Sequence, residues 1–156
     1  MPRRSLIEFL STYPQHGRSI AFVERRGYRI SRWSYRDVAG VAAQFARELE
    51  ARRIAPGDRV LLWGRNSAEW VAAFFGCVLR GAVAVPMDQG ATADFACRVA
   101  EEVDAKLLVV GHEYAMGCGK RTALGLESLR EGVAQRSREP YPSPSLDRNA
   151  LAQPVQ

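Results

Sequence analysis

One short stretch combines glycine with a cation in the manner of a phosphate-binding loop. Residues 117–122 read Gly-Cys-Gly-Lys-Arg-Thr and follow a predicted strand. A P-loop cradles phosphates with backbone N–H groups, and it requires a glycine five residues before its Gly-Lys pair and a Ser or Thr directly after the lysine. Those two positions hold Tyr114 and Arg121. We therefore interpret the stretch as a turn and assign no cofactor-binding residue to it.

The histidines are not spaced to assemble a catalytic or metal site. His112 and Cys118 form a pair with metal-ligand character, whereas zinc takes three or four protein ligands. His16 stands beside Gly17, and a general base needs an orienting partner and a nucleophile. The glycine-any-serine-any-glycine spacing of a nucleophile elbow does not occur in the sequence. We predict no catalytic and no metal-binding residue in this chain.

The cysteines are odd in number, and they are separated by 20 and 21 positions: Cys77, Cys97 and Cys118. Neither a disulfide framework nor a set of paired zinc ligands has this arrangement. Cys77 falls on the apolar face of a predicted helix, where desolvation favours packing over reactivity. We predict that all three are reduced thiols.

The composition is ordinary for one globular domain, with 156 residues, 47% hydrophobic and 25% charged side chains. The longest apolar stretch, residues 71–79, ends at Arg80 and is too short to cross a membrane. Near the amino terminus, Glu8 interrupts the apolar run that a signal peptide needs. We predict a cytoplasmic protein with no transmembrane segment.

The net charge of +5 reflects 22 basic and 17 acidic residues. The densest basic group lies beside Trp33 and Tyr35, a mixture that can stack on and neutralise a polynucleotide. A small basic nucleic-acid or protein-interaction module is therefore the alternative function. Because the excess is small and the arginines are spread along the chain, we interpret the group as a solvated hairpin face and predict no nucleic-acid partner. Its members are Arg25, Arg26, Arg29, Arg32 and Arg36.

Residues 5–10 are predicted to form a short amphipathic turn or two of helix, and a β-hairpin and a longer helix are predicted after them. Residues 19–24 and 28–33 flank Gly27, which supplies the positive φ of a tight reversal. Ser34 then opens a helix, with Asp37 three residues on in the arrangement of a capping box. Apolar side chains on this helix step by three and four, and its polar positions fall largely off that face: Arg36, Arg47, Glu48 and Arg52.

Strands and helices alternate over the next part of the chain. Apolar runs between turn residues predict buried strands at 58–64, 81–86 and 106–110. One helix begins near Ser67 and runs to about Arg80, and another extends from a cap at Thr92 to about residue 103. This order is typical of parallel βαβ units. We predict an α/β fold with a mainly parallel sheet, helices on both faces and an amino-terminal β-hairpin.

The carboxyl-terminal part is less regular. No periodic pattern covers residues 111–125, and a short helix is predicted around 126–133. Four prolines lie between residues 136 and 156, which favours an extended linker or a disordered tail. The predicted organisation is an α/β subdomain over residues 1–135 and a linker or tail over 136–156.

Four short motifs, in register with these elements, add a family resemblance. They are residues 33–38 (Trp-Ser-Tyr-Arg-Asp-Val), 56–60 (Pro-Gly-Asp-Arg-Val), 66–70 (Asn-Ser-Ala-Glu-Trp) and 79–88 (Leu-Arg-Gly-Ala-Val-Ala-Val-Pro-Met-Asp). From about residue 19 to 110 the chain resembles the first part of the large domain of the adenylate-forming superfamily. This family includes acyl-CoA synthetases, acyl-carrier-protein ligases and peptide-synthetase adenylation domains. Residues 87–90 (Met-Asp-Gln-Gly) resemble long-chain acyl ligases more than peptide synthetases.

The resemblance implies a parent enzyme that activates a carboxylic acid with ATP and Mg²⁺ and passes the acyl group to CoA or an acyl carrier protein. The family's phosphate loop ending in Pro-Lys, its aromatic-Thr-Glu segment and its late lysine have no counterpart in this sequence. We therefore expect an amino-terminal fragment of an AMP-forming acid–thiol ligase, of the long-chain fatty acyl-CoA or acyl-carrier-protein type. Alone, the fragment should bind no cofactor and be inactive.

Open sheet edges follow from the same interpretation, because strands whose neighbours lie outside the fragment keep unpaired backbone groups. We expect such an edge to permit a homodimer. A further alternative is an inactive regulatory remnant that docks on an active ligase.

Overall fold

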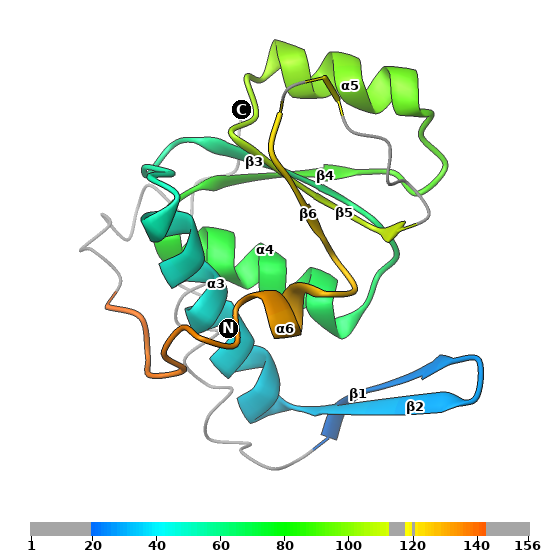
Figure 1. The fold of residues 1–156 in the computed structure, drawn as a ribbon, viewed down its shortest axis with the longest axis vertical. Helices are drawn as coiled ribbons and strands as arrows, with labels where there is room; N and C mark the ends of the chain where they lie inside the picture. The colour runs from blue at the N-terminus through cyan, green and yellow to red at the C-terminus, as the bar shows by residue number, and fades with distance from the viewer. Residues whose placement is uncertain (1–19, 113–117, 120, 143–156) are drawn as a thin grey trace, which may run out of the picture.

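The computed structural model describes residues 20–112, 118, 119 and 121–142. This part of the chain holds a four-stranded sheet with helices on its two faces and a separate two-stranded hairpin (Figure 1). The strand order in the sheet is β4-β3-β5-β6, and all three pairings are parallel. The predicted α/β fold, with a parallel sheet and an amino-terminal hairpin, is confirmed.

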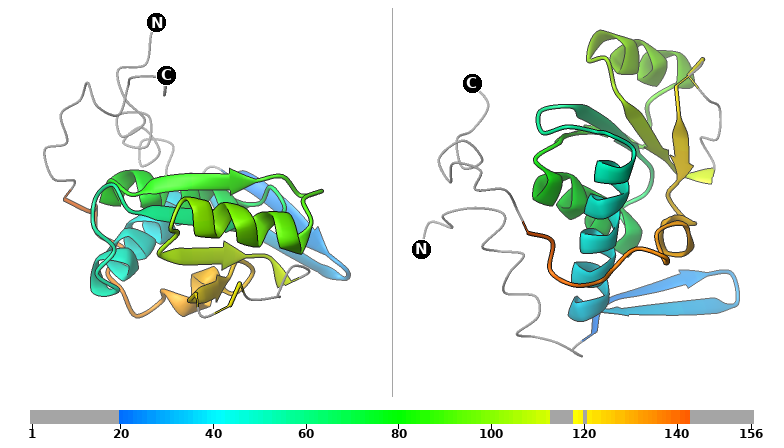
Figure 2. Two further views of the ribbon diagram at one scale, coloured as in Figure 1. Left: turned by 90° about the horizontal axis from the view of Figure 1, so that it is seen from above. Right: turned by 60° about the vertical axis from the view of Figure 1, so that its left-hand side comes forward.

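The hairpin consists of β1 (Ile20–Arg26) and β2 (Arg29–Ser34), paired antiparallel. Gly27 makes the reversal with a φ of 59°, in the left-handed region that glycine adopts without a steric penalty. Figure 2 shows the hairpin projecting away from the layers of the sheet. Three of its large apolar or aromatic side chains are exposed, namely Val23, Tyr28 and Ile30.

The first long helix, α3 (Tyr35–Ala51), begins with the predicted capping box. Asp37 N–H donates to Ser34 Oγ at 3.0 Å, and Ser34 N–H donates to Asp37 Oδ2 at 2.9 Å. Two orphan donors of the helix start are thereby satisfied. One expectation for this helix is wrong, because Glu48 is buried where the apolar pattern placed it on the solvent side.

The sheet comprises β3 (Arg59–Trp63), β4 (Val83–Met87), β5 (Leu107–Val110) and β6 (Ala123–Gly125). The crossover helices are α4 (Ala68–Arg80), between β3 and β4, and α5 (Ala93–Glu102), between β4 and β5. Ser67 and Thr92 cap them as predicted, each accepting from a backbone N–H three residues on. At the other end of α4, Gly81 takes a left-handed φ of 82° that lets the chain turn directly into β4.

Strand β6 was not predicted from the sequence. It pairs parallel with β5, with Val109 opposite Leu124, and Leu108 N–H donates to the carbonyl of Thr122 at 3.0 Å. With three residues it is too short to show an alternation of apolar and polar positions. The short helix α6 (Leu129–Gly132) follows within the predicted range.

Two apolar clusters cover the two faces of the sheet. Val60 and Leu62 of β3 belong to the cluster that includes α3 and α4. Leu61 and Trp63 of the same strand belong to the cluster under α5. Alternate residues of one buried strand thus enter different cores, as expected for a parallel sheet covered on both sides.

Helices α3 and α4 approach closely at Gly76. A Cβ added there would lie 2.6 Å from Phe45 Cδ1 and 3.0 Å from the carbonyl oxygen of Ala42. Elsewhere α4 is less enclosed than its composition predicts, since Trp70 and Phe74 are half-buried, with their rings stacked at 5.7 Å. The contact with α3 is therefore concentrated on one side of α4.

The prediction of three reduced thiols is wrong for two of them. Cys97 of α5 and Cys118 form a disulfide, with Cα atoms 5.1 Å apart. Cys77 is a free, buried thiol on α4. Sequence spacing missed the pair because α5 and the segment after β5 come together only in the fold. None of the helices in the described residues combines the length and the hydrophobicity that a bilayer span needs.

We predict that Gly76→Ala lowers the free energy of unfolding by about 1–3 kcal/mol, because the added methyl overpacks the contact with Phe45. Urea denaturation of the two proteins measures the difference. Gly132→Ala is the matched control, since nothing lies within 4 Å of a Cβ at that position. Equal losses in both variants, or none at Gly76, would show that α3 and α4 are not in tight contact.

Candidate functional site

The carboxyl edge of an open parallel sheet is where a ligand is expected, at the point where crossovers leave on opposite faces. That point lies between β3 and β5, because α4 and α5 cover different faces. Here the Gly111 N–H donates to the carbonyl of Trp63 at 2.8 Å. A Cβ on Gly64 would meet Leu126 Cδ2 at 2.6 Å. Atoms of the described residues therefore fill this position.

His112 and Glu127 meet beside this edge. The backbone N–H of His112 donates to Glu127 Oε2 at 2.8 Å, and the imidazole Nδ1 lies 3.2 Å from Oε1. Partial burial raises the pKa of Glu127, but hydrogen bonds from backbone N–H groups and the His112 side chain outweigh it and hold that pKa below its usual range. The carboxylate orients an exposed imidazole, and among the described residues no contact recorded for the pair involves a nucleophile. The pair links the residues after β5 to the turn between β6 and α6.

A cavity of about 480 Å³ lies between the hairpin and α6. Three glutamates and two arginines contribute to its lining, so it has no excess of positive charge to hold a triphosphate. The lining residues are Arg29, Ile30, Ser31, Trp33, Glu69, Glu127, Arg130 and Glu131.

The hairpin arginines singled out from the sequence do not converge on a site. Arg25, Arg29, Arg32 and Arg36 are exposed on the hairpin and the start of α3. Among the described residues, no group of three or more His, Cys, Asp or Glu side chains is placed to hold a metal ion. His16, Gly117 and Lys120 lie outside the described residues.

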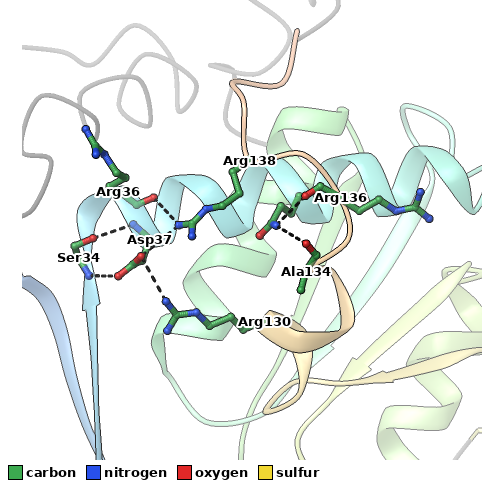
Figure 3. Close-up of polar contacts among 8 residues, drawn as sticks. Ser34, Arg36, Asp37, Arg130, Ala134, Arg136 and Arg138 are labelled. Carbon is green, nitrogen blue, oxygen red and sulfur yellow. Dashed lines mark hydrogen bonds and ion pairs between the residues drawn. The ribbon is translucent and has the colours of Figure 1, made fainter.

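The most extensive polar assembly joins residues 130–142, here called the α3 strap, to helix α3 (Figure 3). At its first anchor, Asp37 of the capping box faces Arg130 and Arg138 at 3.4 and 3.3 Å. The guanidinium of Arg130 also lies 4.5 Å from the centre of the Trp33 ring. Figure 3 shows both arginines converging on Asp37 from the strap. One carboxylate therefore both caps α3 and holds the strap.

Side chains from the middle of α3 bind the backbone of the strap. Gln44 Nε2 donates to the carbonyl of Arg136 at 2.9 Å. Arg47 Nη1 donates to the carbonyls of Ser137 and Glu139 at 2.9 and 2.6 Å. These bonds satisfy carbonyl groups of a segment that belongs to no sheet or helix. Residues 136–142 are thus an extended segment lying along α3, whereas residues 143–156 lie outside the described residues.

A further anchor of the strap is the carboxylate of Glu48. Arg136 Nε pairs with its Oε2 at 2.7 Å, and Arg52 Nε pairs with its Oε1 at 3.0 Å. Desolvation raises the pKa of Glu48, but hydrogen bonds from these two arginines outweigh it and lower that pKa below its usual value. The same balance, with Ser34 and Arg138 as the main donors, lowers the pKa of Asp37. Both carboxylates are therefore held in the charged form.

Sequence reasoning missed the strap because its contacts are separated by about a hundred positions, as between Asp37 and Arg138. The arginine spacing after residue 130 was a usable clue. Arg130, Arg136 and Arg138 are cations in a segment with few apolar residues, and such a segment stays ordered only if partners neutralise it.

Comparison with known proteins provides relatives for this arrangement. A family model described as AMP-binding enzyme matches residues 11–153. The fatty acid–acyl-carrier-protein ligase ScoC of Streptomyces coeruleorubidus is 26% identical over 126 residues, which are 81% of this chain and 24% of that ligase. The non-ribosomal peptide synthetase CmlP of Streptomyces venezuelae is 33% identical over 113 residues, covering 72% of this chain and 11% of the synthetase.

Among solved structures, a fatty acyl CoA synthetase of Mycobacterium tuberculosis superposes with a TM-score of 0.76 and 25% identity. The match covers 90% of this chain and 30% of the synthetase. The chain therefore spans less than a third of the length of these relatives.

We predict that the free energy of unfolding falls as the pH drops below about 4.5. The pKa values of Glu48 and Asp37 are lower in the folded chain than their ordinary values of 4.5 and 3.8. The unfolded chain consequently binds more protons in this range, and the stabilisation present above it is lost as each folded pKa is passed. Denaturant titrations between neutral and acid pH measure this slope.

Glu48→Gln should make the free energy of unfolding depend less steeply on acid pH. It should also lower that free energy at neutral pH by about 1–3 kcal/mol, because two arginines lose a largely buried charged partner. Glu102→Gln, at an exposed position of α5, is the matched control and should change neither quantity. A slope that Glu48→Gln leaves unchanged would contradict the role given to this carboxylate.

Proposed function

Because the chain belongs to the family of AMP-binding enzymes, we propose that it supplies the amino-terminal subdomain of an AMP-forming acid–thiol ligase. The observation that carries the proposal is the family match over residues 11–153, which coincides with a parallel sheet covered on both faces. We take residues 1–135 as this subdomain and residues 136–156 as an extended linker or tail, of which residues 136–142 lie along α3. A cytoplasmic location is part of the same proposal.

The proposed parent reaction has two steps. A carboxylate oxygen attacks the α-phosphorus of ATP, pyrophosphate leaves, and an acyl-AMP forms. A thiol then attacks the acyl carbon, AMP leaves, and a thioester forms. We propose long-chain fatty acids as the acids and CoA or an acyl carrier protein as the thiol, supported by the fatty acid ligase among the relatives.

In the proposed enzyme, the described residues would form part of the scaffold and would not themselves activate ATP. Electrostatic activation of ATP requires cations or N–H groups aimed at the phosphates, and the arginines between α3 and the strap are engaged with other groups. Arg136 and Arg138 pair with carboxylates of α3, and Arg47 binds backbone carbonyls. The α3 strap fixes the path of the polypeptide beyond α6, which is the contribution we propose for it.

We predict that the isolated chain does not catalyse fatty-acid-dependent exchange of labelled pyrophosphate into ATP. A chimera of the ScoC ligase, in which this chain replaces the aligned segment, should catalyse it. ScoC with the segment deleted is the negative control, and unmodified ScoC is the positive one. Exchange by the isolated chain would refute its inactivity. A folded chimera without exchange, as judged by a cooperative thermal transition, would contradict the ligase assignment.

We also propose that the chain self-associates through the open edge of β4. Val83 at the start of this strand is 47% exposed, and Pro86 near its end has no N–H to donate, so pairing would use the first half of the strand.

Val83→Lys should shift a homodimer to monomer in sedimentation velocity, because a lysine on an edge strand opposes pairing with a second copy. Phe95→Lys is the matched control, since Phe95 is similarly exposed, at 49%, but lies on α5. A wild-type chain that stays monomeric at high concentration, or a dimer that Val83→Lys leaves intact, would rule out this edge.

A further inference from the structure

The two bonded cysteines lie on segments that other contacts position. Cys97 is in the middle of α5, a helix with its own N-cap, at Thr92, and a buried face against the sheet. The segment of Cys118 is held by Arg121, whose Nη1 donates to the carbonyl of Ala105 at 2.8 Å. The 5.1 Å between the two Cα atoms falls within the roughly 4.4–6.8 Å that disulfides span. Both segments thus have contacts of their own besides the disulfide.

Exposure separates this pair from the third cysteine. Cys97 and Cys118 are both half-buried, so neither residue is enclosed in the core. Cys77 is completely buried in the cluster on the other face of the sheet, and desolvation raises its pKa to about 12. Since the thiolate is the reactive form, Cys77 takes no part in exchange while the chain is folded.

We propose that Cys97 and Cys118 form a thiol–disulfide exchange site for low-molecular-weight disulfides of the glutathione class. One cysteine thiolate attacks a sulfur of the small disulfide and releases one small thiol, leaving a mixed disulfide. The other cysteine thiolate attacks the protein sulfur of that intermediate and releases the second small thiol. Two electrons pass from the cysteine pair to the small disulfide, and the two cysteine protons end on the released thiols.

Oxidation at this site links Cys118, which precedes β6, covalently to α5. The bond closes a loop with a sequence separation of 21 that contains β5. Closing a loop of this length reduces the conformational freedom of the unfolded chain. The oxidised chain is accordingly more stable than the reduced one, and the effect centres on α5, β5 and the edge strand β6. The contact between α3 and α4 lies on the opposite face and does not depend on the bond.

The test equilibrates the full chain in buffers with different ratios of reduced to oxidised glutathione, followed by acid quenching, unfolding, alkylation and mass spectrometry. Under oxidising ratios we expect one alkylated cysteine, Cys77, and a linked pair of peptides containing Cys97 and Cys118. Under reducing ratios we expect three alkylated cysteines, and the change should be reversible. The melting temperature should be about 5–10 °C higher in the oxidised form.

Cys118→Ser should abolish both the linked peptides and the redox dependence of the melting temperature. Cys77→Ala is the matched control and should retain both. Three alkylated cysteines at every glutathione ratio, or linkage to Cys77, would falsify the exchange site. Equal melting temperatures of the oxidised and reduced forms would contradict the stabilisation of the chain by this bond. None of these readouts depends on ligase activity, so the result stands apart from the proposed function.

Discussion

Parallel strands cannot be joined by a tight turn, and this constraint determines how most of the chain is used. Each neighbouring pair needs a crossover that returns along the sheet, and here α4 and α5 return on opposite faces. Every strand in the middle of the sheet must then bury side chains on both sides. Leu61 and Leu62 show the consequence, because these adjacent residues of β3 are both buried but enter different apolar clusters. The close approach of α3 and α4 at Gly76 completes one of these two layers.

The α3 strap is stabilised by a different kind of contact. Its backbone joins neither sheet nor helix beyond α6, and its arginines carry charge onto a helix surface. Side chains of α3 supply both hydrogen-bond donors and counter-charges. Gln44 and Arg47 donate to strap carbonyls, and Asp37 and Glu48 pair with strap arginines. Burial of Glu48 is tolerated because two guanidinium groups accompany it. These polar contacts act alongside apolar packing, since Val133 and Tyr141 of the strap are buried in the cluster that includes α3 and α4.

At both the carboxyl edge of the sheet and the α3 strap, the described groups are occupied by contacts within the chain. The carboxyl edge between β3 and β5 is filled by Leu126 and by backbone, and the arginines of the strap are engaged with α3. What the described residues provide is a rigid two-faced sheet and a defined path for the segment beyond α6. The family match identifies the class of enzyme that uses such a framework.

Local patterns in the sequence were sufficient for most of the elements. Capping by Ser34, Ser67 and Thr92, the reversal at Gly27 and the apolar strand runs all depend on neighbours a few positions away, so each could be predicted from the residues themselves. Strand β6, the burial of Glu48, the anchoring of Arg138 on Asp37 and the bond between Cys97 and Cys118 were decided only by tertiary structure. Their partners lie on other elements, mostly far away in the sequence, and the energy of an ion pair or a disulfide depends on distances that exist only once the crossovers have brought those elements together.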